Sequence, residues 1–223
     1  MHPDFAHIDT WVFDLDNTLY PPHVDLFGQM ENRMRRFMAA YLSITTDQAE
    51  TLRKQYWADH GTTLAGLMAH HDMPPDDFLH DVHQIDFSVV PHAGDLVALI
   101  DALPGRKLVY TNGTRPYASN VLAARGLDGL FTDIFGIEHA GYAPKPQRAA
   151  FETVFELADV VPAKAAMIED AARNLDVPKE LGMRTVLICP NQTQYGAADI
   201  AHTTLEDALS HILDRTSFVR NPV

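Results

Sequence analysis

The stretch Trp11-Val-Phe-Asp-Leu-Asp-Asn-Thr-Leu-Tyr20 decides the fold of this chain. It joins a short run of β-forming apolar residues to two acids, Asp14 and Asp16, which is the pattern of a buried strand with a polar tip. Because side chains alternate along a strand, the two carboxylates start on the same side. Two like charges held close together need an intervening cation or a retained proton. Taken alone, the motif is equally compatible with an ordinary Asp-rich turn, in which Asp bonds its own backbone.

The composition describes a globular chain of 223 residues, enough for one domain or for one core with a modest insertion. Its 30 acidic and 17 basic residues give a formal net charge of −13, which argues against binding to a nucleic-acid polymer. No apolar stretch approaches the roughly 20 residues that cross a bilayer, and residues 1–7 lack the features of a signal peptide. We therefore expect a cytoplasmic protein that does not associate with membranes. The composition specifies no oligomeric state.

The cysteine and the histidines could in principle form a disulfide or a metal site. Cys189 is the only cysteine and follows an apolar run, so we expect a buried structural thiol and no intramolecular disulfide. The pairs His70-His71 and His80 with His83 have plausible metal-ligand spacing. They lie in helical patterns that look exposed, without a cysteine or a matched second pair, so we expect solvated surface residues rather than a zinc site.

Short apolar runs, each followed by polar or turn residues, predict five strands at residues 11–13, 107–110, 132–135, 165–168 and 185–188. Helical patterns separate the later runs. Examples are residues 117–125, which Gly126 closes, and residues 147–157, which follow Pro146 at an expected first helical position. Alternating strands and helices predict an α/β fold with a doubly wound parallel sheet. In such sheets ligands bind at the carboxyl ends of the strands.

About ninety residues lie between the first two predicted strands, far more than a crossover helix needs. Helical patterns cover residues 24–42 and 46–57, and turn residues then separate two further helical pieces. We therefore predict an inserted helical domain at residues 20–88 and a core domain at residues 1–19 and 89–223. The first insert helix carries an apolar stripe that we expect in the core of the bundle: Leu26, Met30, Met34, Phe37, Met38 and Tyr41.

Residues that follow the predicted strands form the candidate site. Asp14 and Asp16 follow the first strand, and Glu169 and Asp170 follow the fourth. The second strand is followed by a hydroxyl and by residues that allow close approach to an anion, Thr111, Asn112 and Gly113. Prolines on both sides hold Lys145 in a stiff loop before a helix.

Four acids, a hydroxyl and a lysine that converge from separate segments are hard to explain without a cation, because burying that much negative charge is prohibitive. Mg²⁺ takes oxygen ligands and binds through one or two carboxylates plus phosphate oxygens. Asp14, Asp170 and a backbone carbonyl would form its site. Lys145 and Thr111 would then donate to a phosphoryl group, the charge arrangement that phosphoryl transfer needs.

Four ordered motifs, namely Asp14-Leu-Asp16-Asn-Thr18, Thr111, Lys145 and Glu169-Asp170, resemble those of the haloacid dehalogenase-like superfamily, whose members are mostly Mg²⁺-dependent phosphatases. The resemblance spans nearly the whole chain. It implies a Rossmann-like core, and the predicted insert resembles the helical cap that this superfamily places after its first strand. The segments Phe13-Asp-Leu-Asp-Asn-Thr-Leu-Tyr20 and His60-Gly-Thr-Thr-Leu-Ala-Gly-Leu67 look like the pyrimidine 5′-nucleotidase branch.

The resemblance also implies a role for each motif residue. Asp14 would attack phosphorus and become an aspartyl phosphate, while Asp16 would protonate the leaving oxygen and then deprotonate the attacking water. The backbone carbonyl of Asp16 would ligate Mg²⁺. Asp170 would bind the metal directly, and Glu169 either directly or through water. The phosphoryl oxygens would be held by Thr111, Asn112 and Lys145.

Four further residues are candidates with structural alternatives. Asn174 would orient Lys145 or the carboxylates, or lie on a helix surface. Arg115 would meet a phosphate or a base, or be a solvated residue at the start of a helix. Tyr20 and His23 leave the first strand toward the cap and would face a nucleobase, or serve packing and hinge roles.

The expected function is hydrolysis of a small-molecule phosphate monoester, with pyrimidine 5′-nucleotides such as UMP and CMP as the leading substrates. Dehalogenases of the same fold lack the second aspartate, so Asp16 favours phosphate esters. The alternatives are a phosphatase for sugar phosphates or phosphoglycolate, a phosphomutase, and a non-catalytic binding protein. The last of these usually loses the nucleophile or the acid, both of which this chain has.

Overall fold

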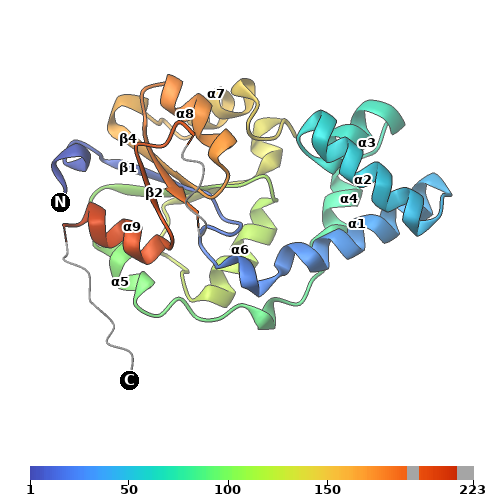
Figure 1. Ribbon diagram of the computed structural model, residues 1–223, viewed down its shortest axis with the longest axis horizontal. Helices are drawn as coiled ribbons and strands as arrows, with labels where there is room; N and C mark the ends of the chain where they lie inside the picture. Colours follow the sequence, from blue (N-terminus) through green and yellow to red (C-terminus); the bar gives the residue numbers. More distant parts are fainter. Residues whose placement is uncertain (190–195, 215–223) are drawn as a thin grey trace.

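The computed structural model describes residues 1–189 and 196–214. The core is a parallel sheet of six strands in the order β3-β2-β1-β4-β5-β6 (Figure 1). The strands are β1 (Thr10–Phe13), β2 (Arg106–Tyr110), β3 (Asp133–Phe135), β4 (Ala165–Glu169), β5 (Arg184–Ile188) and β6 (Ile200–His202). The order reverses between β2 and β4, with β1 at the switch, so the predicted doubly wound parallel sheet is confirmed.

The register of the sheet brings the polar strand tips together. Phe13 pairs with Val109 on β2 and with Ile168 on β4. The residues that follow these three positions therefore lie side by side at the carboxyl edge of the sheet. The Asp14 backbone N–H donates to the Ile168 carbonyl at 2.9 Å, which extends the ladder to the first acid.

Helices cover both faces of the sheet, because its central strands are apolar on both sides. Trp11 and Phe13 of β1 face the core on the side of α5, α6 and α9, whereas Val12 faces the core on the side of α7 and α8 (Figure 1). These helices are α5 (Leu96–Asp101), α6 (Arg115–Arg125), α7 (Arg148–Leu157), α8 (Asp176–Glu180) and α9 (Leu205–Ile212). Short 3₁₀ segments occupy Pro3–Phe5, Pro22–Val24, Phe87–Val89, Ile137–Ala140, Pro162–Lys164 and Ala172–Leu175.

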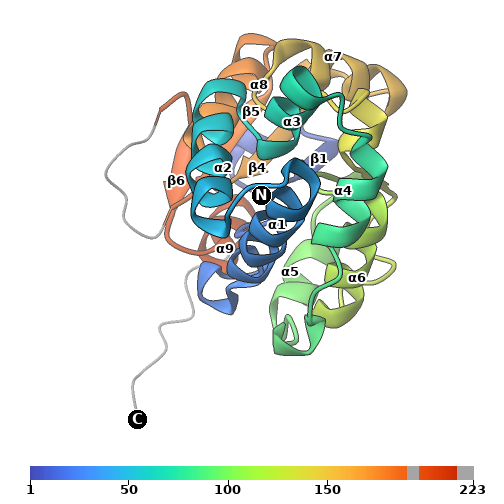
Figure 2. The ribbon, with the colours of Figure 1, turned by 90° about the vertical axis from the view of Figure 1, so that its right-hand side faces the viewer.

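Four helices between β1 and β2 form a separate layer that faces the carboxyl edge of the sheet (Figure 2). They are α1 (Leu26–Leu42), α2 (Thr46–His60), α3 (Thr63–His71) and α4 (Pro75–Val82). A capping box of Thr45 and Gln48 starts α2. These helices share an apolar cluster with Ile137 of the core. The helical insertion after the first strand is thus confirmed, and we keep residues 20–88 as the proposed extent of this cap.

The ends of several elements differ from the sequence predictions. We did not predict β6, because three residues are too few to show a strand pattern. Helix α6 starts two residues earlier than expected, at Arg115, since Thr114 caps it and proline is tolerated in a first turn. Helix α7 starts at Arg148 with Gln147 as its N-cap, so Pro146 precedes the helix and does not open it.

The apolar stripe of α1 packs in two apolar clusters, one on the sheet and one within the cap. Leu26 and Met30 join the cluster that packs on the sheet, whereas Phe37 and Met38 pack within the cap. Tyr41 is 45% exposed, because it lies on the last turn of α1, where it stacks on Phe37 at 6.1 Å between ring centroids. The prediction of a bundle core is therefore wrong for Tyr41.

Cys189 is half-buried at the end of β5, not fully buried as predicted, because it sits at the rim of the second apolar cluster. His70 and His80 are exposed as expected. His83 is half-buried, because its ring stacks on Tyr117 with centroids 4.4 Å apart. No helix within the described ranges is long and apolar enough to cross a membrane.

We predict that Gly105→Ala destabilises the protein more than Gly129→Ala. Both glycines have positive φ, +79° and +77°, so an L side chain costs roughly 1–2 kcal/mol at either position. A Cβ at Gly105 would also lie 2.1 Å from the Asp9 carbonyl beside β1, whereas a Cβ at Gly129 meets nothing within 4 Å. We expect this overlap to add about 1–3 kcal/mol. Guanidinium unfolding measures both changes, and equal losses would contradict the predicted overlap.

Candidate active site

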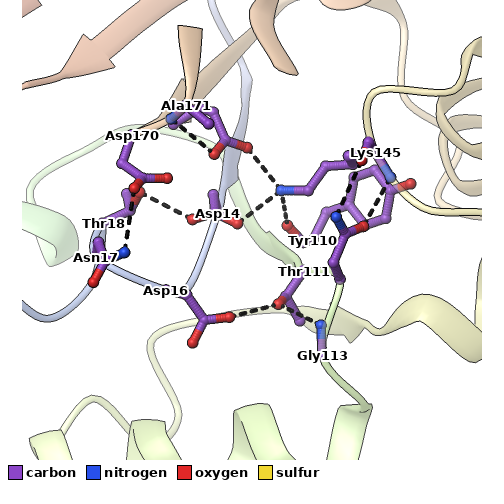
Figure 3. A network of polar contacts seen from close by, with 12 residues as sticks. Asp14, Asp16, Asn17, Thr18, Tyr110, Thr111, Gly113, Lys145, Asp170 and Ala171 are labelled. Atoms are coloured by element: carbon purple, nitrogen blue, oxygen red, sulfur yellow. Dashed lines mark hydrogen bonds and ion pairs between the residues drawn. The ribbon is translucent and has the colours of Figure 1, made fainter. Parts of the chain in front are cut away.

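Buried Lys145 lies at the centre of the site (Figure 3). Its Nζ is 2.7 Å from Asp14 Oδ1, 2.7 Å from Glu169 Oε2 and 3.1 Å from the Tyr110 carbonyl. Asn112 anchors the loop that carries the lysine, because its side chain accepts from the Lys145 N–H at 2.8 Å and donates to the Lys145 carbonyl at 3.2 Å. The three strand tips are thus tied to one ammonium group.

Asp14 is 5% exposed and accepts a second bond on Oδ2, from Thr18 Oγ1 at 3.0 Å. The chain turns sharply after Asp16, where Asn17 adopts a φ of +60°. Asn17 Nδ2 then reaches Asp170 Oδ2 at 3.4 Å, across to the tip of β4. Both acid-bearing tips therefore face the same space, as Figure 3 shows.

Asp14, Glu169 and Asp170 offer carboxylate oxygens that all lie within 4.8 Å of one another. Burial raises the pKa of Asp14 to about 7, with a further rise from Glu169 and an opposing effect from Lys145. Burial, Asp14 and Glu169 raise the pKa of Asp170 to about 9. For Lys145, burial disfavours the charged form, but Asp14 and Glu169 together raise its pKa above the usual value.

One ammonium does not compensate three carboxylates at this distance, and a divalent cation with oxygen ligands would relieve their repulsion. The donor set therefore fits Mg²⁺. Within residues 1–189 and 196–214 it is the one group of three or more acid, histidine or cysteine side chains close enough to share an ion. Neither histidine pair noted in the sequence belongs to such a group.

Asp16 is half-buried and is held by three hydroxyls. Tyr20 and Tyr117 each donate to Oδ1 at 2.6 Å, and Thr111 Oγ1 lies 3.3 Å from Oδ2. Thr111 also accepts from the Gly113 N–H at 2.9 Å, which fixes its hydroxyl in the site. Burial raises the pKa of Asp16, and the bonds from the two tyrosines act in the opposite direction.

A cleft of about 520 Å³ lies between the strand tips and the cap. Its core side includes Asp14, Asp16, Asn112, Lys145, Glu169 and Asp170, and its cap side is largely apolar, with Met30, Met34, Leu64, Phe78, Leu79 and Val82. Trp57 of α2 lines it as a half-exposed ring. The Arg173 guanidinium, just past the β4 tip, lies 4.7 Å from the centroid of that ring.

The structure brings together the main site residues predicted from sequence: Asp14, Asp16, Thr111, Asn112, Lys145, Glu169 and Asp170. Asn174 also lines the cleft, is 7% exposed, and its Oδ1 has no hydrogen-bond partner among the described residues. It is therefore not a helix-surface residue. The remaining three candidates lie outside the cleft lining.

Tyr20 is buried against Asp16 and does not face the cleft. His23 is exposed in the segment before α1. Arg115 is half-exposed and pairs with Asp133 at 3.1 Å, so it is a surface residue at the start of α6. For His23 and Arg115 the structure therefore favours the non-functional alternatives.

Sequence reasoning missed Tyr117, His83 and Arg53, all of which line the cleft. Tyr117 lies in the first turn of α6, directly after the Thr111 tip, so its position near a strand end was a usable signal. His83 and Arg53 come from the cap, and no local sequence pattern indicates which face of the cap packs against the core.

Comparisons with known proteins show which chains this one is similar to. Phosphate metabolism protein 8 of Saccharomyces cerevisiae is 26% identical over 219 residues, which cover 89% of this chain and 66% of that protein. The chain thus spans about two thirds of the length of this curated relative.

Solved structures share the fold at low identity. CbbY from Rhodobacter sphaeroides, in complex with phosphate, has a TM-score of 0.64 and 18% identity, with 89% of this chain and 95% of that chain covered. The HAD hydrolase YfnB from Bacillus subtilis, bound to magnesium, has a TM-score of 0.60 and 20% identity, with 93% and 99% covered. An L-2-haloacid dehalogenase from Xanthobacter autotrophicus, with chloropropionic acid covalently bound, has a TM-score of 0.58 and 16% identity, with 92% and 98% covered.

These identities show the fold and leave the reaction open, since phosphatases and dehalogenases are both among the neighbours. Residues 8–182 match the family model described as haloacid dehalogenase-like hydrolase. That match covers well over half of the chain. The protein therefore belongs to the haloacid dehalogenase-like hydrolase family.

Proposed function

We propose that this hydrolase is a Mg²⁺-dependent phosphomonoesterase that acts through an aspartyl-phosphate intermediate. The observation that carries the proposal is the pairing of two different acids at one strand tip. Asp14 contacts Lys145 and lies among carboxylates that suit a metal, whereas Asp16 is held by hydroxyl groups two residues away. A nucleophile and a separate proton donor are what hydrolysis of a phosphate ester requires.

In the first step a carboxylate oxygen of Asp14 forms a bond to phosphorus, and the ester P–O bond breaks. Asp16 gives its proton to the departing alcohol oxygen. Lys145 and the Thr111 hydroxyl donate to the phosphoryl oxygens as charge builds on them. In the second step Asp16 takes a proton from water, the water oxygen bonds to phosphorus, and the Asp14 carboxylate is released together with inorganic phosphate.

Asp14, Asp170, the Asp16 carbonyl and Glu169, directly or through water, would hold Mg²⁺. When bound, the cation supplies positive charge that offsets repulsion between the phosphoryl group and the acids. Asn174 lies in the same wall of the cleft, and its unpartnered Oδ1 is available to a ligand or a water.

The leading alternative reaction is dehalogenation. A halide leaves as an anion and needs no proton, so the first step of that reaction gives Asp16 no role as an acid. The bonds from Tyr20, Tyr117 and Thr111 instead hold the Asp16 carboxyl group in one orientation, which suits a group that transfers a proton. A phosphomutase would have to keep the phosphoryl group, and a binding protein would not need the nucleophile.

We further propose that the substrates are pyrimidine 5′-nucleotides such as UMP and CMP. Thr62, Thr63 and Leu64, from the cap segment that resembles the pyrimidine 5′-nucleotidases, line the cleft. The apolar cap side suits an uncharged leaving group with a flat ring. The half-exposed Trp57 ring offers an aromatic surface in the same cleft.

The charges of the cap side also disfavour a substrate with a second anionic group. Arg53 pairs with Glu31 and Glu50, each at 3.0 Å, and Lys54 pairs with Glu50 at 3.1 Å. Among the described cleft residues, the remaining cations are Arg173, which lies over Trp57, and Lys145. On the cap side, a carboxylate such as that of phosphoglycolate would therefore meet only cations that already pair with an acid.

We predict that Asp14→Asn lowers phosphate release by about 10³-fold or more, because the amide is not a nucleophile. The variant should fold, since Lys145 keeps Glu169 as a partner and one buried charge is removed. Phosphate release and circular dichroism measure both points, with Asp128→Asn on the surface as the matched control. Near wild-type turnover in Asp14→Asn would refute the proposed nucleophile.

A second prediction concerns the metal. Mg²⁺ should raise the unfolding temperature of the wild type by binding the folded state. Asp170→Asn should weaken Mg²⁺ binding by about tenfold or more, equivalent to about 1.4 kcal/mol or more. It should not destabilise the metal-free protein, because the raised pKa of Asp170 reflects an unfavourable buried charge. Calorimetric titration with Mg²⁺ gives the affinity directly; unchanged affinity would exclude Asp170 as a ligand.

A third prediction concerns the substrate. With Mg²⁺ present, we expect kcat/KM for UMP and CMP to exceed that for phosphoglycolate, ribose 5-phosphate and AMP by about tenfold or more. A phosphate-release assay on this panel measures the preference. A higher kcat/KM for phosphoglycolate would contradict the argument from the paired cap cations and favour a small-metabolite phosphatase.

A further inference from the structure

Two buried phenols converge on one oxygen of Asp16. Tyr20 and Tyr117 each place a hydroxyl 2.6 Å from Oδ1, and the two hydroxyls are 3.4 Å apart. Both tyrosines are 1% exposed. A buried phenol needs a hydrogen-bond partner, and here both find it on the same atom. Oδ1 is thereby occupied by two O–H donors.

The second oxygen of Asp16 has a different environment. Oδ2 lies 3.3 Å from Thr111 Oγ1, on the side of the site where the phosphoryl group is expected. Figure 3 shows this oxygen turned toward Thr111. An oxygen that already accepts two short O–H bonds has little capacity for a further proton, so Oδ2 is the oxygen left for proton exchange.

Tyr117 is held in place by the cap as well as by Asp16. Tyr117 follows the Thr114 N-cap of α6 and packs under the ring of His83, which comes from the end of α4 in the cap. The ring planes differ by 13°, and His83 Nδ1 lies 3.2 Å from Thr114 Oγ1. Tyr117 is therefore clamped between the cap and the acid.

We infer that Tyr20 and Tyr117 are positioning residues for proton transfer: by occupying Oδ1, they fix the Asp16 carboxyl group with Oδ2 toward the leaving oxygen. The inference rests on the proposed phosphomonoesterase function. In the first step the Oδ2–H bond breaks as the proton moves to the alcohol oxygen released from phosphorus. In the second step Oδ2 recovers a proton from the attacking water.

Loss of this positioning should affect substrates differently according to their leaving group, whereas a general loss of packing should affect all substrates alike. Alkyl phosphates such as nucleoside monophosphates need a proton on the leaving oxygen, whereas 4-nitrophenolate leaves as an anion. The ratio kcat/KM covers only the steps up to departure of the leaving group. Misorienting Asp16 should therefore lower kcat/KM for alkyl esters and spare it for 4-nitrophenyl phosphate.

The test compares Tyr20→Phe, Tyr117→Phe and the double variant on UMP and on 4-nitrophenyl phosphate with Mg²⁺. We expect each single variant to lose about tenfold and the double variant about 100-fold in kcat/KM for UMP. For 4-nitrophenyl phosphate we expect less than about threefold loss. If UMP is not turned over, the best alkyl ester from a panel of CMP, AMP and ribose 5-phosphate replaces it.

Tyr56→Phe is the matched control, because Tyr56 is also buried and loses one bond, of 2.7 Å to His71 Nε2, within the cap. This variant should leave kcat/KM unchanged for UMP and for 4-nitrophenyl phosphate. Equal losses on the two esters, or no loss on either, with unfolding temperatures like the wild type, would overturn the positioning role alone. A wild type that releases phosphate from no alkyl ester would overturn the proposed function and this inference with it.

Discussion

The contact of one buried ammonium with two buried carboxylates is the interaction on which this structure depends. Lys145 Nζ joins Asp14 to Glu169, and so joins the first strand to the fourth through a loop that follows the third. A buried charge without a partner costs several kcal/mol, and removing one member of a buried pair exposes the other to that cost. The acids are therefore kept together by the lysine, and the lysine stays charged because of the acids.

That arrangement is still short of positive charge. Three carboxylates share one ammonium, and burial raises the pKa values of Asp14 and Asp170 well above those of free aspartate. The site therefore has an excess of negative charge that a cation can compensate, and a bound cation in turn favours binding of an anion. The repulsion among these carboxylates would be relieved by a metal, and the positive charge of that metal and of Lys145 would favour a phosphoryl group.

The sequence predicts this part of the molecule because local pattern and topology agree. Trp11 and Phe13 alternate with Val12 across the sheet, which makes β1 recognisable from its apolar residues alone. Parallel strands place their carboxyl ends at one edge, so residues that follow separate runs were expected to meet. Asp14 and Lys145, 131 positions apart, do meet at 2.7 Å.

The rest depends on packing that no local pattern encodes. The stacking of His83 on Tyr117 follows from how the cap rests on the core, and four helices with similar apolar faces offer many such arrangements. Tyr20 was seen as a candidate for the cleft, but its ring turns into the core, where its hydroxyl meets Asp16. The sequence therefore predicts the helices of the cap, but it does not predict which core residues these helices contact.

The Trp57–Arg173 contact gives this chain a property of practical use. The sequence contains two tryptophans. Trp11 of β1 is fully buried and donates to the Pro104 carbonyl, whereas Trp57 is 52% exposed on the cap beside a cation of the core. Indole emission responds to solvent and to nearby charge, so a change in emission on ligand binding would come from Trp57. Trp57 is thus an intrinsic fluorescence probe of the contact between the cap and Arg173 of the core.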